Sequence, residues 1–202
     1  MRQPRDALDV SKLPTVVFGH RDVMWWGTTF FAVIEGFTLA LCAATYLYLR
    51  KNFVTWPPER TPAPSLLLPT LSLLVLFASL YPAWWTKRQA YRLDLRAVRR
   101  GLVASTAIGS LAFLLRFTEF VALNTRWDAH AYGSIAWLTV GFHVLLHLFD
   151  IGDTIGLTVL SVVGPWEEKH FVNTADNSNY WYFMVLSWIP LYALVFLGPH
   201  LL

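Results

Sequence analysis

The sequence is poor in charged residues, and this scarcity excludes an ordinary soluble fold. Of its 202 residues, 14% are charged and 55% are hydrophobic, whereas about a quarter of the residues in a typical soluble domain are charged. Several apolar segments reach about twenty residues, the length that crosses a bilayer as a helix. The composition therefore indicates a polytopic membrane protein.

Cysteine is almost absent, and so are the usual motifs of catalysis. The single cysteine, Cys42, cannot form an intrachain disulfide, and we expect it to be a small buried residue. The sequence contains no Gly-rich phosphate loop, no catalytic triad and no cysteine-bearing metal motif. Residues 1–22 have no apolar run, so no secretory signal is expected. We therefore expect no redox centre and no catalysis by this chain alone.

The apolar segments and the basic residues together predict a topology. Basic residues are concentrated in 87–100, so we interpret the net charge of +3 as a topology signal rather than nucleic-acid binding. The positive-inside rule then places 87–100 and a polar arm, 1–22, in the cytoplasm and the C-terminus outside. The prediction is an all-α bundle of five transmembrane helices over 23–202, with 165–179 as a polar loop. The expected spans are Val23–Leu49, Ser65–Trp85, Gly101–Leu123, His130–Val163 and Tyr180–Leu197.

The main candidate site consists of polar residues inside the fourth span. His143, His147 and Asp150 are spaced at i, i+4 and i+7, so they share one helix face, and Asp153 lies to one side of it. An ionisable group within a span costs about 2.5–3.5 kcal/mol and usually faces the protein interior with a partner. Glu35 lies near the middle of the first span. We therefore expect these two spans to pack together, with Glu35 meeting a histidine.

This cluster is compatible with more than one function. Carboxylates and imidazoles within spans hold or relay protons in pumps and transporters, but they also act as buried clamps that fix helix register. A proton-coupled transporter would use the same groups, although five spans without an inverted repeat count against it. The spacing of His143 and His147, with Asp150, also suits a metal ion, but no second histidine pair lies within the spans. We expect no metal site.

A second polar pair lies in the third span. Arg116 and Glu119 are spaced at i and i+3, so they can form an ion pair on one helix face. The alternative is that Arg116 binds the phosphate of a lipid.

Several short motifs follow one another along the chain. They are Trp25-Trp26-Gly27, Glu35 in a Phe-rich span, Trp56-Pro57-Pro58, Ala131-Tyr132-Gly133-Ser134 followed by Thr139-Val140-Gly141-Phe142-His143, and Tyr180-Trp181 with Phe183 and Trp188. In order and spacing, over about residues 24–198, this set resembles the cytochrome c oxidase subunit III family.

This resemblance implies a non-catalytic, all-helical subunit of a haem-copper terminal oxidase in aerobic electron transport. Such a subunit packs on subunit I beside subunit II and other respiratory subunits, supports proton uptake into subunit I and binds phospholipid. The haem and copper then belong to the partner subunits, and no cofactor is expected in this chain. The expected location is the bacterial plasma membrane. Glu35 occupies the position of the family's buried carboxylate.

The sequence also departs from the family pattern. Many members have seven spans, and we expect the first two to be missing here. His147 follows His143 by four residues rather than the usual three, and Tyr182 and Val185 replace a histidine and an aspartate of the last span. A subunit III-like accessory protein of nitric oxide reductase shares the same frame and is the alternative identity.

Overall fold

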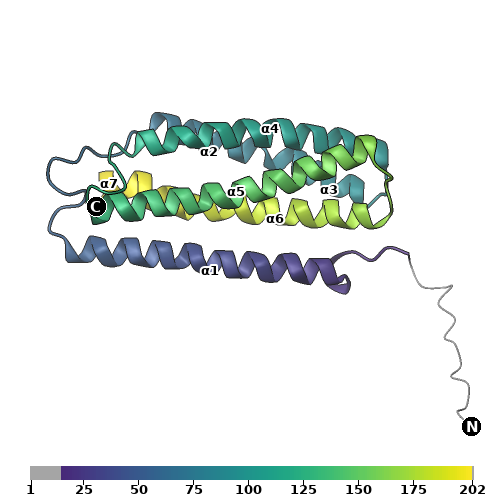
Figure 1. The fold of residues 1–202 in the computed structure, drawn as a ribbon, viewed down its shortest axis with the longest axis horizontal. Coiled ribbons are helices and arrows are strands. Elements are labelled where there is room, and N and C mark those ends of the chain that lie inside the picture. The colour runs from purple at the N-terminus through teal and green to yellow at the C-terminus, as the bar shows by residue number, and fades with distance from the viewer. Residues whose placement is uncertain (1–14, 202) are drawn as a thin grey trace, which may run out of the picture.

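The computed structural model describes residues 15–201, and long helices running side by side make up almost all of this part (Figure 1). Of the expected arm 1–22, residues 1–14 lie outside the described part, and the rest includes a 3-10 turn, η1 (Gly19–Arg21). The helices are α1 (Val23–Asn52), α2 (Leu67–Ala78), α3 (Leu80–Ala90), α4 (Leu95–Ala122), α5 (Ala131–Val163), α6 (Lys169–Tyr192), the π segment η2 (Ala193–Leu197) and α7 (Gly198–Leu201).

Five helical segments are long and apolar enough to cross a membrane. Two of them combine several elements, because α2 continues into α3 and α6 continues through η2 into α7. The described residues contain no strand. The predictions of an all-α, multi-pass membrane protein and of five membrane helices are therefore confirmed.

Prolines mark the irregular points of two spans. Pro82 has no N–H, so the carbonyl of Ala78 loses its usual helical partner where α2 ends and α3 begins. The side chain of Ser79 bridges this break, because its Oγ donates to Leu76 O (2.5 Å) and accepts from Trp181 Nε1 (2.8 Å). Pro190 lies within α6, and the helix passes it and changes to the π segment three residues later. Each of the two spans therefore continues past its proline, held by contacts with neighbouring helices.

The fifth span begins earlier than its composition suggested. We expected a loop over 165–179, but α6 already begins at Lys169, so the loop prediction is wrong for residues 169–179. The polar side chains that suggested a loop are buried against neighbouring helices, and Thr174, Asp176 and Asn177 are at most 9% exposed. The basic segment 87–100 also shortens to a tight connection, since α3 ends at Ala90 and Asp94 caps α4 by accepting from Ala97 N.

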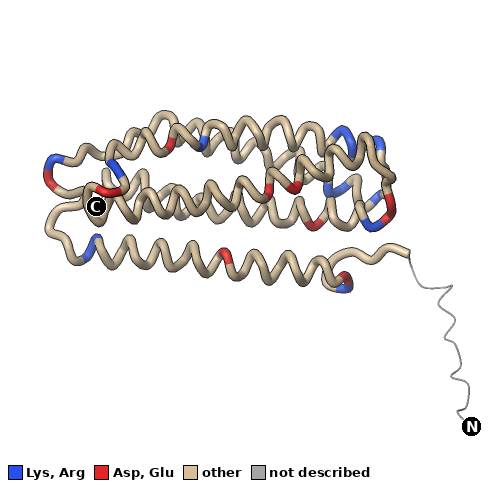
Figure 2. Tube along the Cα trace, in the orientation of Figure 1, with Lys and Arg blue, Asp and Glu red and all other residues tan. Residues whose placement is uncertain are grey.

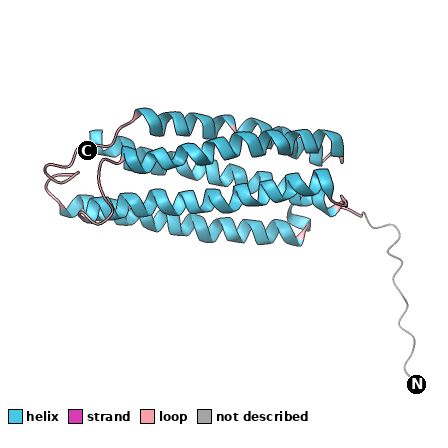
Figure 3. Cartoon of the chain, turned by 45° about the horizontal axis from the view of Figure 1, so that its top comes forward, coloured by secondary structure: helices cyan, strands magenta, loops and turns pink. Residues whose placement is uncertain are grey.

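The first helix, α1, lies at the edge of the bundle. It contacts α5 and α6 through one stripe of buried side chains spaced at helical intervals, Glu35, Leu39, Cys42 and Tyr46. In the view of Figure 1 the other helices lie together on one side of α1. Figure 3 shows that loops join the helices at both ends of the bundle. Many of the Lys and Arg residues gather at the end of the bundle where α3 meets α4 (Figure 2).

Candidate functional site

The buried carboxylate of α1 is bound to a tyrosine of α6. Glu35 is 5% exposed, and its Oε2 accepts a hydrogen bond from the hydroxyl of Tyr180. The expectation that Glu35 meets a histidine is therefore wrong. The physical reason is the early start of α6: Tyr180 lies eleven residues beyond Lys169, or about 16 Å along the helix, rather than at the membrane surface.

His143 points from α5 to α6. Its ring is completely buried, and Nε2 lies 2.9 Å from the carbonyl oxygen of Met184 and 3.3 Å from Ser187 Oγ. A carbonyl oxygen can only accept a hydrogen bond, so Nε2 carries the hydrogen and donates it. The imidazole also packs on Trp188, with ring centres 4.6 Å apart. His143 is thus a buried link between two helices.

His147 lies in an aromatic environment. Its ring is completely buried between Phe113 and Trp181, at centroid distances of 5.3 and 5.4 Å. The backbone of Gly109 is its polar neighbour. His147 therefore packs like an aromatic core residue rather than as part of a chain of hydrogen-bonding side chains.

Asp150 and Asp153 belong to a separate cluster in the second half of α5. The side-chain amide of Asn177, on α6, donates to Asp150 Oδ1 (3.3 Å) and to Asp153 Oδ2 (3.1 Å). Thr154 Oγ1 donates to the amide oxygen of Asn177 (3.2 Å) and fixes its orientation. One oxygen of Asp150, Oδ2, is buried and has no hydrogen-bond partner among the described residues.

These carboxylates face a cavity between α1, α5 and α6. The cavity has a volume of about 410 Å³, and Asp150, Asp153 and Asp176 contribute the charged groups of its lining. Tyr180 also lines it, so the bond to Glu35 lies at its wall. We call this site the acidic cavity. Its lining carboxylates come from α5 and α6, and Glu35 on α1 is bound to Tyr180 at its wall.

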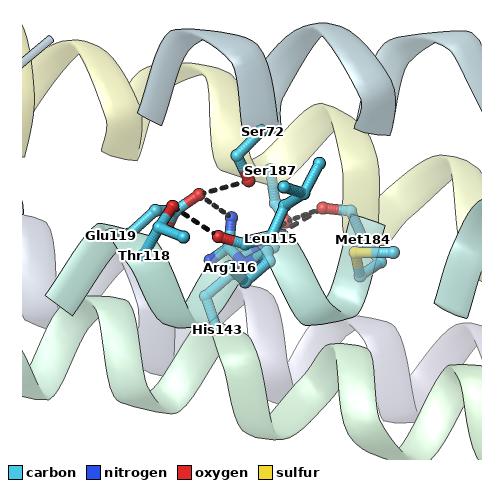
Figure 4. A network of polar contacts seen from close by, with 8 residues as sticks. All are labelled: Ser72, Leu115, Arg116, Thr118, Glu119, His143, Met184 and Ser187. Carbon is cyan, nitrogen blue, oxygen red and sulfur yellow. Dashed lines mark hydrogen bonds and ion pairs between the residues drawn. The ribbon is translucent and has the colours of Figure 1, made fainter. Parts of the chain in front are cut away.

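Arg116 and Glu119 form an ion pair in the core of the bundle (Figure 4). Arg116 Nη1 lies 3.3 Å from Glu119 Oε1, and neither side chain is exposed. Ser72 Oγ donates to the same oxygen (2.8 Å), and the guanidinium lies over the ring of Trp188, 3.8 Å from its centre. Figure 4 shows Arg116 beside His143. Because Arg116 is 0% exposed, a lipid phosphate would reach it only if the helices separated.

The polar residues expected on one face thus divide between two places. His143 and His147 face the α4–α6 core beside Arg116, whereas Asp150 lies at the acidic cavity. Within residues 15–201, no three His, Cys, Asp or Glu side chains are placed to hold a metal ion. The metal hypothesis for His143, His147 and Asp150 therefore finds no support in their geometry.

Sequence reasoning missed the contribution of α6. The sequence placed Tyr180 at the first position of the fifth span and Asn177 in the loop before it, yet both are buried and bind carboxylates of other helices. A signal was present, because Asn173, Asn177 and Tyr180 are spaced at i, i+4 and i+7, the pattern of one helix face.

The sequence is similar to subunits of cytochrome c oxidase from distant organisms, although no family model matches it. It is 26% identical over 187 residues to "Cytochrome c oxidase subunit 3" of Synechocystis, covering 89% of this chain and 77% of that protein. It is 28% identical over 144 residues to the subunit 3 of Pongo pygmaeus, covering 70% of this chain but 54% of that protein. It is 28% identical over 145 residues to "Probable cytochrome c oxidase subunit 3" of Mycobacterium tuberculosis, covering 70% of each.

These similarities agree with the structure. Half of the motif residues that carry the resemblance are buried, among them Glu35, Trp56, Tyr132, Gly133, His143, Trp181 and Trp188. Trp56 packs between Tyr46 and Tyr132, at 5.3 and 5.0 Å, and attaches the loop after α1 to the start of α5. The buried motif residues therefore lie at contacts that hold the helices together, and the chain is similar to cytochrome c oxidase subunit 3 over most of its length.

Proposed function

We propose that this protein is subunit III of a haem-copper terminal oxidase, a non-catalytic membrane subunit that stabilises the catalytic subunit during aerobic electron transport. The observation that carries the proposal is the similarity to a cytochrome c oxidase subunit 3 over 89% of the chain. Five candidate membrane helices and the burial of motif residues such as Glu35, Tyr132 and His143 support it.

The structural part of this role follows from the buried polar contacts. An ion pair or a charged hydrogen bond within a membrane bundle is costly to separate, because no water replaces the lost partner. The Arg116–Glu119 pair, with Ser72 and Trp188, joins α4 to α2 and α6. The Tyr180–Glu35 bond joins α6 to α1. Together these contacts fix the positions of the helices relative to one another, so the partner subunit packs against a rigid surface.

The acidic cavity supports a second part of the role, the supply of protons to the partner. Its carboxylates lie toward the end of the bundle where many Lys and Arg residues gather (Figure 2). The positive-inside rule assigns that end to the cytoplasm, the side from which protons are taken up. Asp150, Asp153 and Glu35 would hold protons there, close to the entrance of the partner's uptake route. The chemistry of oxygen reduction would stay with the haem and copper of the partner subunits.

The same argument gives the proposed membrane orientation and the neighbours of this subunit. With this end in the cytoplasm, the C-terminus lies on the outer side of a bacterial plasma membrane. Subunit I is the main partner, subunit II and other respiratory subunits complete the complex, and phospholipid fills the remaining apolar faces of α1 and α4.

Purification from native membranes through a tag on this chain tests the proposal. We expect a haem-copper oxidase to co-purify, identified by its haem spectrum and its oxygen consumption. Recovery of an intact haem-copper oxidase that lacks this chain would overturn the proposal. Co-purification of nitric oxide reductase instead would assign the chain to that enzyme. Recovery of the chain alone, active in a proton-coupled transport assay after reconstitution, would make it a transporter.

A further inference from the structure

The acidic cavity carries carboxylates that no basic side chain neutralises. Asp150, Asp153 and Asp176 line it. Among the described residues, no Lys, Arg or His lines the cavity, and none has a nitrogen within 4.0 Å of these carboxylate oxygens. Lys87 acts on Asp176 electrostatically, but its hydrogen bond goes to Asn179 (2.6 Å). Buried like charges are stable only where protons or a bound cation neutralise them.

A single amide group holds two of these carboxylates side by side. Asn177 Nδ2 donates to Asp150 Oδ1 (3.3 Å) and to Asp153 Oδ2 (3.1 Å), and its amide oxygen accepts from Thr154 Oγ1 (3.2 Å). A side-chain amide nitrogen has two hydrogens, so each carboxylate takes one of them. The two carboxylates are therefore neighbours in fixed positions, and Asn177 engages one oxygen of each.

Two buried oxygens at the cavity have no partner. Asp150 Oδ2 and Asp176 Oδ2 make no hydrogen bond within the described part of the chain, and their residues are 3% and 4% exposed. A buried polar atom without a partner costs about 1–3 kcal/mol, and more if it is charged. Asp153 lines the same cavity and is exposed, so a ligand can reach the pair from the surface.

These oxygens are the ligands of a hard cation that keeps part of its water. Carboxylates suit Mg²⁺ and Ca²⁺, whereas Zn²⁺ prefers nitrogen and sulfur ligands. No three acidic, His or Cys side chains of the described chain converge on one point, so protein groups alone do not enclose an ion. Mg²⁺ needs only one or two carboxylates, because it retains several waters. A water molecule takes up about 30 Å³ in the liquid, so a cavity of about 410 Å³ has room for the ion and its water shell.

We propose that the acidic cavity binds a hydrated Mg²⁺ ion, with Asp150 and Asp153 as direct ligands and Asp176 reached through the ion's water shell. The site differs from the one that the histidine spacing suggested, because neither His143 nor His147 takes part. The inference does not rest on the proposed oxidase role, since every ligand belongs to this chain. A metal ion and a proton compete for a carboxylate, so bound Mg²⁺ would limit how many protons these groups hold.

Binding of Mn²⁺, a paramagnetic substitute for Mg²⁺, to the full-length protein in detergent tests the proposal. The protein is first treated with a chelator, and the EPR signal of free Mn²⁺ then measures how much of the ion is bound. We expect one Mn²⁺ per chain, displaced by Mg²⁺ but not by an equal concentration of K⁺. No binding at millimolar Mn²⁺, or no displacement by Mg²⁺, would overturn the proposal, whether or not an oxidase co-purifies with the chain.

Substitutions locate the ion within the cavity. Asp150→Asn keeps the size of the side chain and removes its charge, and it should weaken Mn²⁺ binding at least tenfold, the smallest effect typical of a lost partner outside the ligand shell. Asp153→Asn should weaken binding to a similar extent. It lies at an exposed position, so it decides the question if Asp150→Asn fails to fold, and unchanged binding in it contradicts the site.

A matched control separates the cavity from general charge attraction. Glu168→Gln removes an exposed carboxylate directly before α6, outside the lining of the acidic cavity, and should keep the native affinity for Mn²⁺. Equal weakening in Glu168→Gln and in the two cavity variants would show that Mn²⁺ follows the overall charge, and the assigned site would be wrong.

Discussion

The hydroxyl of Tyr180 on α6 donates a hydrogen bond to Oε2 of Glu35 on α1. This bond is an interhelical polar contact near the middle of α1, a helix that otherwise meets the bundle through a narrow buried stripe. It joins the outermost helix to the core at the wall of the acidic cavity. Its loss should therefore loosen α1 before it affects the other helices.

Tyr180→Phe tests the strength of this contact. Removal of the hydroxyl leaves a buried carboxyl group without its donor, which costs about 1–3 kcal/mol. The free energy of unfolding in detergent, measured by denaturant titration, should fall by that amount. Tyr182→Phe is the matched control, since its hydroxyl makes no hydrogen bond within the described chain. A loss of stability in the control as large as in Tyr180→Phe would contradict this account.

Substitutions of Glu35 separate its structural role from its proposed proton-holding role. Glu35→Gln keeps a side-chain oxygen that can accept the hydrogen bond from Tyr180. The amide group, however, does not take up and release a proton as a carboxyl group does. We expect it to retain the stability of the native chain while oxygen reduction by the complex declines faster during sustained turnover. Glu35→Ala should show both defects. Complete loss of oxygen reduction from an assembled enzyme with intact haems would contradict an accessory role.

The sequence predicted the helices better than their contacts. The apolar run His130–Val163 agrees with α5 to within one residue, because length and hydropathy determine where a membrane helix lies. The start of α6 was missed, since Asp176 and Asn177 are polar residues that neighbouring helices cover almost completely. The partner of Glu35 could not be read from spacing, because it depends on how far α6 extends and how it is rotated against α1.

The ion pair in the core should be more sensitive to the loss of one partner than of both. Arg116→Met leaves the buried Glu119 without a counter-charge, which costs about 3–5 kcal/mol and should prevent stable insertion. The double variant Arg116→Met/Glu119→Leu removes both charges and should recover much of the yield of folded protein. Size-exclusion profiles of the two variants after extraction provide the measurement. A double variant that is worse than the single one would show that the pair is not the main contribution of these residues.

Gly133 in the Ala131–Ser134 motif has a steric role that can be isolated. A Cβ at this position would lie 2.3 Å from the backbone oxygen of Arg126, which cannot move aside easily. Gly133→Ala should therefore lower the free energy of unfolding by about 1–3 kcal/mol. Gly152 lies in the same helix, and a Cβ there would have no neighbour within 4 Å, so Gly152→Ala is the control and should keep or slightly raise stability. Equal behaviour of the two variants would exclude the close approach of α5 to the preceding loop.

The two histidines of α5 should respond differently to replacement by phenylalanine. His147 packs between two aromatic rings, so His147→Phe preserves the shape of the contact and should leave stability within about 1 kcal/mol of the native value. His143 donates to the Met184 carbonyl, and His143→Phe removes that donor from a buried position. We expect a loss of about 1–3 kcal/mol there. Unfolding titrations of the two variants in the same detergent make the comparison. If His147→Phe were the more damaging change, its imidazole would be part of a functional polar network after all, and the division between core histidines and cavity carboxylates would have to be abandoned.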